Sequence, residues 1–414
     1  MDKSDFFVPG KITVVLDGSA GSSGKGMVNS SLAVRFKPDA VICNNGTNAG
    51  HCVVVHKKDF TGRVDDNLSD KIFKKLADDT YKAVFKVFPA SAIVTKKCPI
   101  LIAPDAGFSV DRFFEELRMI DDPSRVKVHP RACIVTKKHA EKSAENKHVS
   151  GTMSGFGPAQ AKKLMRDKDC DIAMNYKELQ PYLGDTSKIV QDILKDNGSV
   201  LFELPQGFDL SLNHGHEWPK LTSRDVTAAI AANSSGVSPK RIGKIFINVR
   251  PYPIRVGNIA GESSGTCYDS PELTWEEINR RSGADKVGAD LTEITTVTMR
   301  KRRVFEFSSE QLRRACAYNE PDGLFLTFTC QINYSSNGAQ SIKDIPKKAL
   351  EEIAVFIANV ELAANDGCKV VAIATGPDCR HFLAVDDTLR NLIDDCLVKA
   401  SDFTDKILHS VAKK

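Results

Sequence analysis

The sequence lacks the long apolar runs, the leader pattern and the one-sided charge that would point to a membrane, to export or to a nucleic-acid surface. No hydrophobic stretch approaches the roughly 20 residues of a membrane-spanning helix, and residues 1–5 carry no signal-peptide pattern. The 57 basic and 53 acidic residues leave a net charge of only +4, scattered along the chain. We therefore expect neither a membrane nor a nucleic acid among its partners.

Paired cysteines are also missing. The 11 cysteines are an odd number, and no two of them are spaced as Cys-x-x-Cys. This pattern argues against a disulfide framework and a structural zinc site, and it is typical of buried thiols in a reducing compartment. We expect a cytoplasmic protein. His214 and His216 have metal-like spacing, but no cysteine or carboxylate set accompanies them, so we interpret this segment as a loop.

Short β-branched runs alternate with longer amphipathic stretches along the whole chain. The runs are 12–16, 40–43, 132–135, 200–203, 245–249, 324–328 and 370–374. This alternation predicts an α/β fold with a large, mostly parallel central sheet flanked by helices. The clearest helix follows Asp344 and ends before Gly367. The polar stretches 57–70 and 137–150 are predicted to be surface loops, and residues 1–414 are expected to form a single domain.

A glycine-rich turn follows the first predicted strand. Residues 14–26 read VVLDGSAGSSGKG, an apolar run followed by glycines, a lysine and a helix-compatible segment. Such a turn places backbone N–H groups and a cation around phosphate. It is not a strict Walker A motif, because Ser19 stands where the first glycine should be and Gly26 follows the lysine where Ser or Thr would hold Mg2+. The turn predicts a phosphate ligand and disfavours an ordinary P-loop ATPase.

Other polar residues have both a functional and a structural interpretation. A lysine beside a helix N-terminus is unfavourable without an anion, which favours phosphate contact for Lys25. Ser22 and Ser23 can also act as helix N-caps, and for Ser23 this interpretation is as good as a ligand role. His51 lies between a turn-rich segment and an apolar run, and is expected at the edge of a strand. The basic run 300–303, beside several threonines, suits a carboxylate or phosphate but is equally compatible with a solvated face or a nucleic-acid patch.

Taken in order, these segments resemble the adenylosuccinate synthetase family, whose members join aspartate to the 6-position of a purine using a nucleoside triphosphate. The resemblance implies that family's P-loop-NTPase-like α/β fold with helical insertions. The matching blocks span nearly the whole chain in the family's order: 21–26, 48–51, 151–152 with 157–159, 206–207, 255–257, 300–303 and 375–378.

The resemblance also implies four groups of site residues. The catalytic group is Ser22, Lys25, His51 and Gln206. The nucleoside triphosphate is expected against Gly21, Ser23, Gly24, Lys25, Gly26, Gly50, His51, Thr375, Gly376 and Pro377. The purine monophosphate is expected against Ser22, Asn48, Thr152, Arg166, Gln206, Thr222 and the backbone of Val256. The aspartate carboxylates are expected against Thr298, Arg300 and Arg302.

A magnesium ion and a second subunit follow from the same resemblance. Lys25 would contact the transferred phosphoryl group, and His51 would polarise the oxygen that bridges the phosphates. Mg2+ would be held at Gly50, through its carbonyl, and at Ser22. Arg166 resembles the arginine that reaches into the partner subunit's site, so a homodimer is expected.

Position 22 departs from the family, which has an aspartate there that takes the proton from purine N1 and touches Mg2+. A positioned general base typically contributes about 10²–10⁴-fold, so its loss needs a reason. The hydroxyl of Ser22 leaves room for, and can hydrogen-bond with, a 2-amino group that a carboxylate would crowd. The chain therefore looks like the phage-type 2-amino-2'-deoxyadenylosuccinate synthetases of the diaminopurine pathway, which act on dGMP. Asp17 stands where the family usually has glycine. It is a candidate for the missing base, or for a residue that contacts the ligands of the metal without binding the metal itself.

The segment that would read the base of the triphosphate departs as well. The family uses Thr-Lys-x-Asp, whereas residues 327–330 read Thr-Phe-Thr-Cys, and Ala374 replaces a serine. Losing a charged hydrogen-bond partner removes roughly 1.5–3 kcal/mol of discrimination for guanine, so ATP or dATP is expected as phosphoryl donor. Ser154 replaces a family arginine near Thr152.

The expected reaction converts dGMP, L-aspartate and ATP into N6-succino-2-amino-2'-deoxyadenylate, ADP and phosphate through a 6-phosphoryl intermediate, in the cytoplasm of an infected bacterial host if the protein is viral. One alternative is an ordinary adenylosuccinate synthetase acting on inosine monophosphate with GTP, against which Ser22, Cys330 and Ala374 argue. Another is a non-catalytic nucleotide-binding protein, against which the retained residues argue together: His51, Lys25, Gln206 and the two clamp arginines, Arg300 and Arg302.

Overall fold

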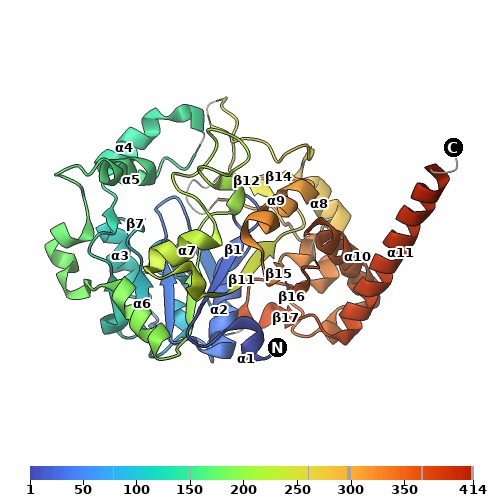
Figure 1. Ribbon diagram of the computed structural model, residues 1–414, viewed down its shortest axis with the longest axis horizontal. Helices are drawn as coiled ribbons and strands as arrows, with labels where there is room; N and C mark the ends of the chain where they lie inside the picture. The colour runs from blue at the N-terminus through green and yellow to red at the C-terminus, as the bar shows by residue number, and fades with distance from the viewer. Residues whose placement is uncertain (78, 150, 260, 296–299, 365–366, 412–414) are drawn as a thin grey trace.

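A nine-stranded sheet runs through the centre of the computed structural model, which describes residues 1–77, 79–149, 151–259, 261–295, 300–364 and 367–411 (Figure 1). Its strands lie in the order β17 (Phe382–Ala384), β16 (Val370–Ala374), β15 (Gly323–Leu326), β11 (Ile242–Val249), β1 (Ile12–Asp17), β10 (Val200–Glu203), β2 (Ala40–Cys43), β6 (Ile100–Ile102) and β8 (Val126–Val128). Neighbouring strands pair in parallel, except that β17 is antiparallel to β16. The predicted α/β fold with a large, mostly parallel sheet is confirmed.

Helices and small sheets surround this central sheet. The α-helices are α1 (Lys3–Phe6), α2 (Lys25–Phe36), α3 (Val110–Leu117), α4 (Lys137–Glu145), α5 (Phe156–Leu164), α6 (Thr186–Lys195), α7 (Ala228–Ser235), α8 (Trp275–Ser282), α9 (Ser309–Asn319), α10 (Lys347–Ala364) and α11 (Asp387–Val411). The small sheets are β3 (His51–His56), β5 (Thr80–Phe85) and β4 (Phe73–Lys75); β12 (Ile254–Arg255), β14 (Arg303–Phe305) and β13 (Glu272–Leu273); and β7 (Gly107–Phe108) with β9 (Cys133–Ile134). Helix α11, red in Figure 1, runs outward from the body.

The central strands are buried on both faces, which explains their continuous apolar sequences. In β1, Val15 packs in a core with α2 and α3, whereas Val14 and Leu16 pack in a second core with α6, α7, α9, α10 and α11. The predicted helix after Asp344 is confirmed as α10. Among the described helices, none is long and apolar enough to cross a membrane.

Two details of the sequence interpretation change. The predicted loop 137–150 is wrong, because residues 137–145 form α4, whose N-terminus is capped by the side chain of Thr136. The run KKHAEKSAE is polar, but it is rich in helix-forming residues and buries His139 against the protein. The predicted strand 132–135 is shorter and lies outside the central sheet, as β9.

Parallel pairing brings the carboxyl ends of the strands to one edge, where ligands of such sheets bind. The glycine-rich turn leaves β1 at this edge and leads into α2. Gln206 follows β10, Thr327 follows β15, and Thr375 follows β16. The topology thus gathers segments from distant parts of the sequence.

Candidate active site

A cavity of about 750 Å3 lies at this edge of the sheet. Its wall is built by the loops after β1, β10, β15 and β16 and by the start of β3. The predicted site residues that line it are Gly21, Ser22, Ser23, Gly24, Lys25, Gly26, Asn48, Gly50, His51, Thr152, Gln206, Thr222, Val256, Arg302, Gly376 and Pro377. The structure therefore brings together most members of the catalytic, triphosphate and purine monophosphate groups, but only Arg302 of the aspartate group.

Four predicted residues are not part of the described wall. Thr298 lies outside the described residues. Thr375 is buried beside the wall, where its hydroxyl donates to the carbonyl of Ala339 at 2.7 Å. Arg300 is not among the residues that line the cavity, and its N–H donates to the hydroxyl of Thr295 at 2.9 Å. Arg166 follows α5 in a left-handed conformation, with φ of 57°.

Lys25 is the first residue of α2 and is buried at the floor of the cavity. The N-cap position of α2 is Gly24, with φ of 75°, so neither Ser22 nor Ser23 occupies it. The ammonium of Lys25 donates to the carbonyl of Gln206 at 2.6 Å and lies 3.6 Å from the carboxylate of Asp17. Burial lowers the pKa of Lys25, and the charges of Asp17 and Glu203 partly offset this. A buried cation at a helix N-terminus is suited to a phosphoryl group.

Asp17 lies behind this lysine rather than in the cavity wall. One of its oxygens accepts from the N–H and the hydroxyl of Ser19, at 2.6 and 2.7 Å, and the other faces Lys25. Asp17 is fully buried and is not among the residues that line the cavity. This position argues against the suggestion that Asp17 takes a proton from the purine, and makes it a partner of Lys25.

His51 opens β3, and a buried carboxylate orients its ring. Nδ1 of His51 makes a close contact with Oε1 of Glu203, and the carboxylate of Glu203 also accepts from the N–H of Ala90 at 3.1 Å. This arrangement leaves Nε2 of His51 as the ring nitrogen available to a ligand. Glu203 was not predicted from the sequence, although an acidic residue that ends the apolar run of β10 was a usable signal.

Three non-glycine residues of the wall have left-handed backbones: Ser22 (φ 58°), Gln206 (φ 66°) and Phe328 (φ 57°). Such conformations cost on the order of 1–3 kcal/mol each and persist only where neighbours hold them. In this site, two buried cationic side chains hold the left-handed residues in place. Arg250 donates to the carbonyl of Ser22 at 2.8 Å and its guanidinium lies 4.5 Å from the ring centroid of Phe328, while Lys25 holds the carbonyl of Gln206.

Polar side chains converge on the part of the cavity expected to take the purine monophosphate. The amide of Asn48 donates to the hydroxyl of Thr222 at 3.0 Å, and its buried Oδ1 has no hydrogen-bond partner in the described structure. The carbonyl of Val256 accepts from the hydroxyl of Ser264 at 2.5 Å. These contacts preorganise groups that can recognise a sugar and a phosphate.

The part of the wall expected to take the triphosphate base is mostly apolar. Phe328, Cys330, Tyr334 and Ala374 line it. Burial raises the pKa of the Cys330 thiol to about 12, so the thiol is neutral and cannot replace a carboxylate. Of the described residues that line the whole cavity, only Glu293 is acidic, and two arginines engage it. Neither Glu293 nor Arg250 was predicted from the sequence.

The donor atoms around the glycine-rich turn are compatible with Mg2+ but do not form a complete protein cage. No group of three His, Cys, Asp or Glu side chains within the described ranges is arranged to hold a metal. Ser22 and Gly50 contribute hard oxygen donors to the wall, and Mg2+ is typically held by few protein groups together with substrate phosphates and water. These residues therefore fit an ion that enters with a triphosphate.

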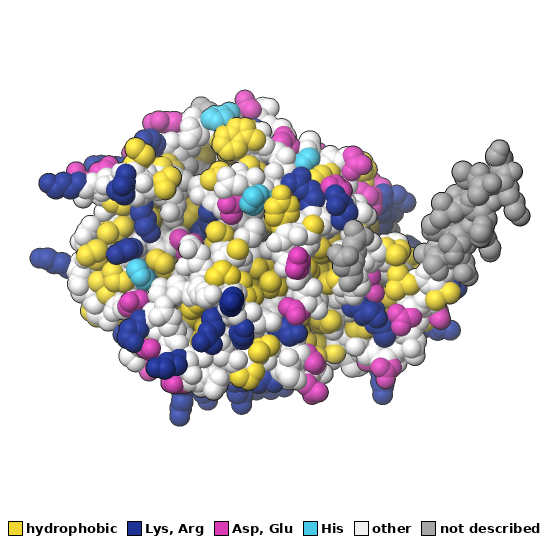
Figure 2. All heavy atoms as spheres, viewed as in Figure 1, with side chains coloured by type: hydrophobic (Ala, Val, Ile, Leu, Met, Phe, Trp, Pro, Cys, Tyr) yellow, Lys and Arg dark blue, Asp and Glu magenta, His cyan; other side chains and the backbone are white. Residues whose placement is uncertain are grey.

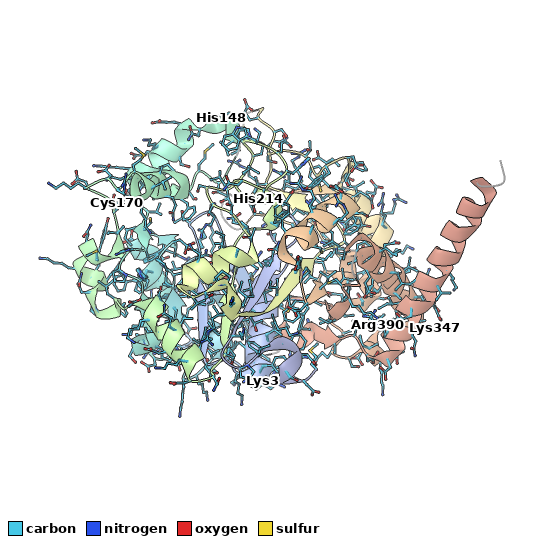
Figure 3. The ribbon with its side chains drawn as sticks, viewed as in Figure 1. Lys3, His148, Cys170, His214, Lys347 and Arg390 are labelled. Atoms are coloured by element: carbon cyan, nitrogen blue, oxygen red, sulfur yellow. The ribbon has the colours of Figure 1, made fainter. Side chains whose placement is uncertain are left out.

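The predicted loop at His214 and His216 is confirmed. The His216 ring stacks on a tyrosine, and the His214 ring is tilted against another. His214 lies 4.9 Å from the ring centroid of Tyr318, and His216 lies 3.8 Å from that of Tyr268. His214 thus lies beside α9, near the middle of the view in Figure 3. On the face drawn in Figure 2, basic and acidic side chains are interspersed.

Comparisons with known proteins agree with this geometry. The model of the family described as adenylosuccinate synthetase matches residues 168–333. The adenylosuccinate synthetase of Pyrococcus horikoshii is 31% identical over 91% of this chain and 99% of its own length. The N6-succino-2-amino-2'-deoxyadenylate synthase of Vibrio phage phiVC8 is 30% identical over 77% of this chain and 85% of its own length.

A solved structure shares the fold with a TM-score of 0.71 and 26% identity, over 93% of this chain and 99% of its own. It is the succinoaminodeoxyadenylate synthetase of cyanophage S-2L bound to dGMP and to dATP as an energy donor. Because the archaeal and phage relatives are about equally similar, overall identity does not separate their substrates. The substrate of this chain therefore has to be inferred from the residues that line the cavity.

Proposed function

The chain belongs to the adenylosuccinate synthetase family, and from this premise we propose that it joins L-aspartate to the 6-position of dGMP, with ATP or dATP as phosphoryl donor. The products are N6-succino-2-amino-2'-deoxyadenylate, the nucleoside diphosphate and phosphate, and the reaction serves diaminopurine deoxynucleotide synthesis.

The observation that carries this proposal is the hydroxyl of Ser22 in the cavity wall. Ser22 is half-buried, and its backbone is held by Arg250. A hydroxyl can accept a hydrogen bond from the 2-amino group of guanine, whereas an aspartate would fill that space. The cyanophage structure with bound dGMP and dATP supports the same choice of nucleotides.

The first step would transfer the γ-phosphoryl group to the purine 6-oxygen. An O–P bond would form at that oxygen, the bond from the γ-phosphorus to the bridging oxygen would break, the nucleoside diphosphate would leave and the N1 proton would pass to solvent. Catalysis of such a transfer depends on positioning and charge stabilisation. Lys25 and the N-terminal amides of α2 would bind the phosphoryl oxygens, and His51, oriented by Glu203, would polarise the bridging oxygen. Mg2+, held by Gly50 and Ser22, would neutralise charge on the triphosphate. Gln206 lies against Lys25 and would complete this end of the site.

The second step would form the C–N bond as the amine of aspartate displaces phosphate. Arg302, which lines the cavity, would bind an aspartate carboxylate through its guanidinium. Arg300 and Thr298 would complete this subsite. Asn48, Thr152, Thr222 and the backbone of Val256 would hold the purine monophosphate, as the resemblance implies.

We also propose a homodimer in which Arg166 reaches the partner's site. Arg166 does not line the cavity of its own chain. It follows Leu164 and Met165, whose exposures of 82% and 77% are unusual for large apolar side chains and suit an interface.

The test is turnover by the purified protein with Mg2+ and L-aspartate, pairing ATP, dATP or GTP with dGMP, GMP or inosine monophosphate, and identifying products by mass. We expect the succinylated diaminopurine deoxynucleotide from dGMP with ATP or dATP. Preferred use of inosine monophosphate with GTP would show instead the activity after which most of the relatives are named. Nucleotide binding without turnover of any pair would show a binding protein.

A further inference from the structure

Arg250 is a fully buried cation just after β11 that touches two parts of the cavity wall. Its guanidinium donates to the carbonyl of Ser22 at 2.8 Å, and it lies over the ring of Phe328. The same guanidinium pairs with Glu293, through a 3.3 Å contact from Nη1 to Oε2 and a closer one from Nη2 to Oε1. Arg250 thus connects the purine side of the cavity with the triphosphate-base side.

Glu293 extends this connection to the aspartate side. Its Oε2 lies 3.5 Å from Nε of Arg302, and its Oε1 accepts from the amide of Gln331 at 3.2 Å. The backbone reinforces the pairing, because the N–H of Arg302 donates to the carbonyl of Glu293 at 2.9 Å and Trp275 Nε1 donates to the carbonyl of Arg302 at 2.8 Å. One carboxylate therefore contacts side chains from several different segments.

The orientation of Arg302 follows from these contacts. Nε faces Glu293, and no other ion pair or side-chain hydrogen bond of this guanidinium occurs among the described residues. The two terminal nitrogens are therefore available to the cavity, which Arg302 lines. Paired terminal nitrogens match the two oxygens of a carboxylate.

The charges of this cluster favour an added anion. Arg250 and Arg302 carry two positive charges, and Glu293 carries one negative charge. Burial opposes ionisation of Glu293, but the charges of Arg250 and Arg302, together with hydrogen bonds from Arg250 and Gln331, outweigh it and keep the pKa of Glu293 below its usual value. One positive charge remains for an incoming carboxylate. If the charge of Glu293 were removed, the guanidiniums of Arg250 and Arg302 would lose their shared anionic partner and would repel each other.

We propose that the Arg250–Glu293 pair is a positioning element that aims the terminal nitrogens of Arg302 at the aspartate carboxylate while it holds Ser22 in its left-handed turn. The inference deepens the proposed function and rests on it. Neither residue of the pair needs to touch a reacting atom. The pair fixes the aspartate subsite relative to the purine subsite, so removing its charge should affect aspartate more than the nucleotides.

The test is Glu293→Gln, which keeps the shape and removes the charge. We expect the KM for L-aspartate to rise at least about tenfold, with the KM for ATP within about twofold of wild type. Glu361→Gln is the matched control, because Glu361 is a buried carboxylate that likewise pairs with an arginine, at 2.9 Å. This arginine is Arg390 of α11, which is labelled in Figure 3. The control should lower the melting temperature and leave all KM values unchanged.

Glu293→Asp is the second variant. It keeps the charge but shortens the reach, so its KM for aspartate should lie between those of wild type and Glu293→Gln, and it can be used if the glutamine variant does not fold. An aspartate KM unchanged in the folded variants, or one that rises in step with the KM for every nucleotide, would overturn the positioning role while wild-type turnover left the proposed function standing. Absence of turnover by the wild type with every pairing would overturn both.

Discussion

Replacement of Ser22 by Asp tests the central step of the substrate argument. Aspartate is among the residues that best tolerate a left-handed backbone, and Arg250 binds the carbonyl of residue 22 rather than its side chain. We therefore expect Ser22→Asp to fold with little change in melting temperature. Its effect should be confined to the cavity, where the side chain gains a carboxylate.

The expected change in substrate preference can be worked out from how residue 22 would meet the 2-amino group. With dGMP, the variant gives up one hydrogen bond to that group, about 0.5–1.5 kcal/mol, and gains a crowded approach, about 1–3 kcal/mol. Together these correspond to a decrease of about 10- to 1000-fold in kcat/KM, at about 1.4 kcal/mol per factor of ten. With inosine monophosphate, which has no 2-amino group, the added carboxylate supplies a base for N1 and kcat/KM should rise.

The assay measures kcat/KM for dGMP and for inosine monophosphate with saturating ATP and L-aspartate. Ser22→Gly is the matched control, since glycine accepts the left-handed backbone and leaves the space open. It should lose only the hydrogen bond, a decrease of about 2- to 10-fold with dGMP. A preference for dGMP that is unchanged or stronger in Ser22→Asp would refute the reasoning.

Three further predictions concern the rest of the site. Cys330→Asp should raise the ratio of GTP to ATP use by about 10- to 150-fold, because a carboxylate can accept from guanine; an unchanged ratio of kcat/KM values would contradict the assignment of this pocket. Glu203→Gln should lower kcat about 10²-fold with little change in KM, since His51 loses the partner that orients it; Glu116→Gln, which alters another buried carboxylate, should leave kcat unchanged. Because burial lowers the pKa of Lys25, this residue should lose its positive charge before the pH reaches the ordinary lysine pKa of about 10.4. Binding of ADP should therefore weaken as the pH rises toward that value. Calorimetry that shows a constant affinity for ADP up to pH 10 would contradict this prediction.

Much of the architecture could be predicted because it depends on local patterns. The apolar runs of β1, β10 and β16 identify strands buried on both faces. The glycine-rich turn lies between β1 and α2 and lines the cavity, and its binding of phosphate stays a prediction. Helix α4 was missed because its charged sequence was interpreted through polarity alone, although its capping residue and helix formers were present.

Local sequence patterns were enough to establish the fold class, the position of the glycine-rich turn and the side chains available at the carboxyl ends of the strands. The pairing of those side chains became known only from the folded chain. His51 and Glu203 are 152 residues apart, and Arg250 meets Glu293 from a different segment. Asp17 turns toward Lys25 and away from the cavity. Such pairings depend on strand order and on which way each side chain points. The position of a charged residue in the sequence therefore does not reveal which residue of opposite charge will lie next to it in the buried interior.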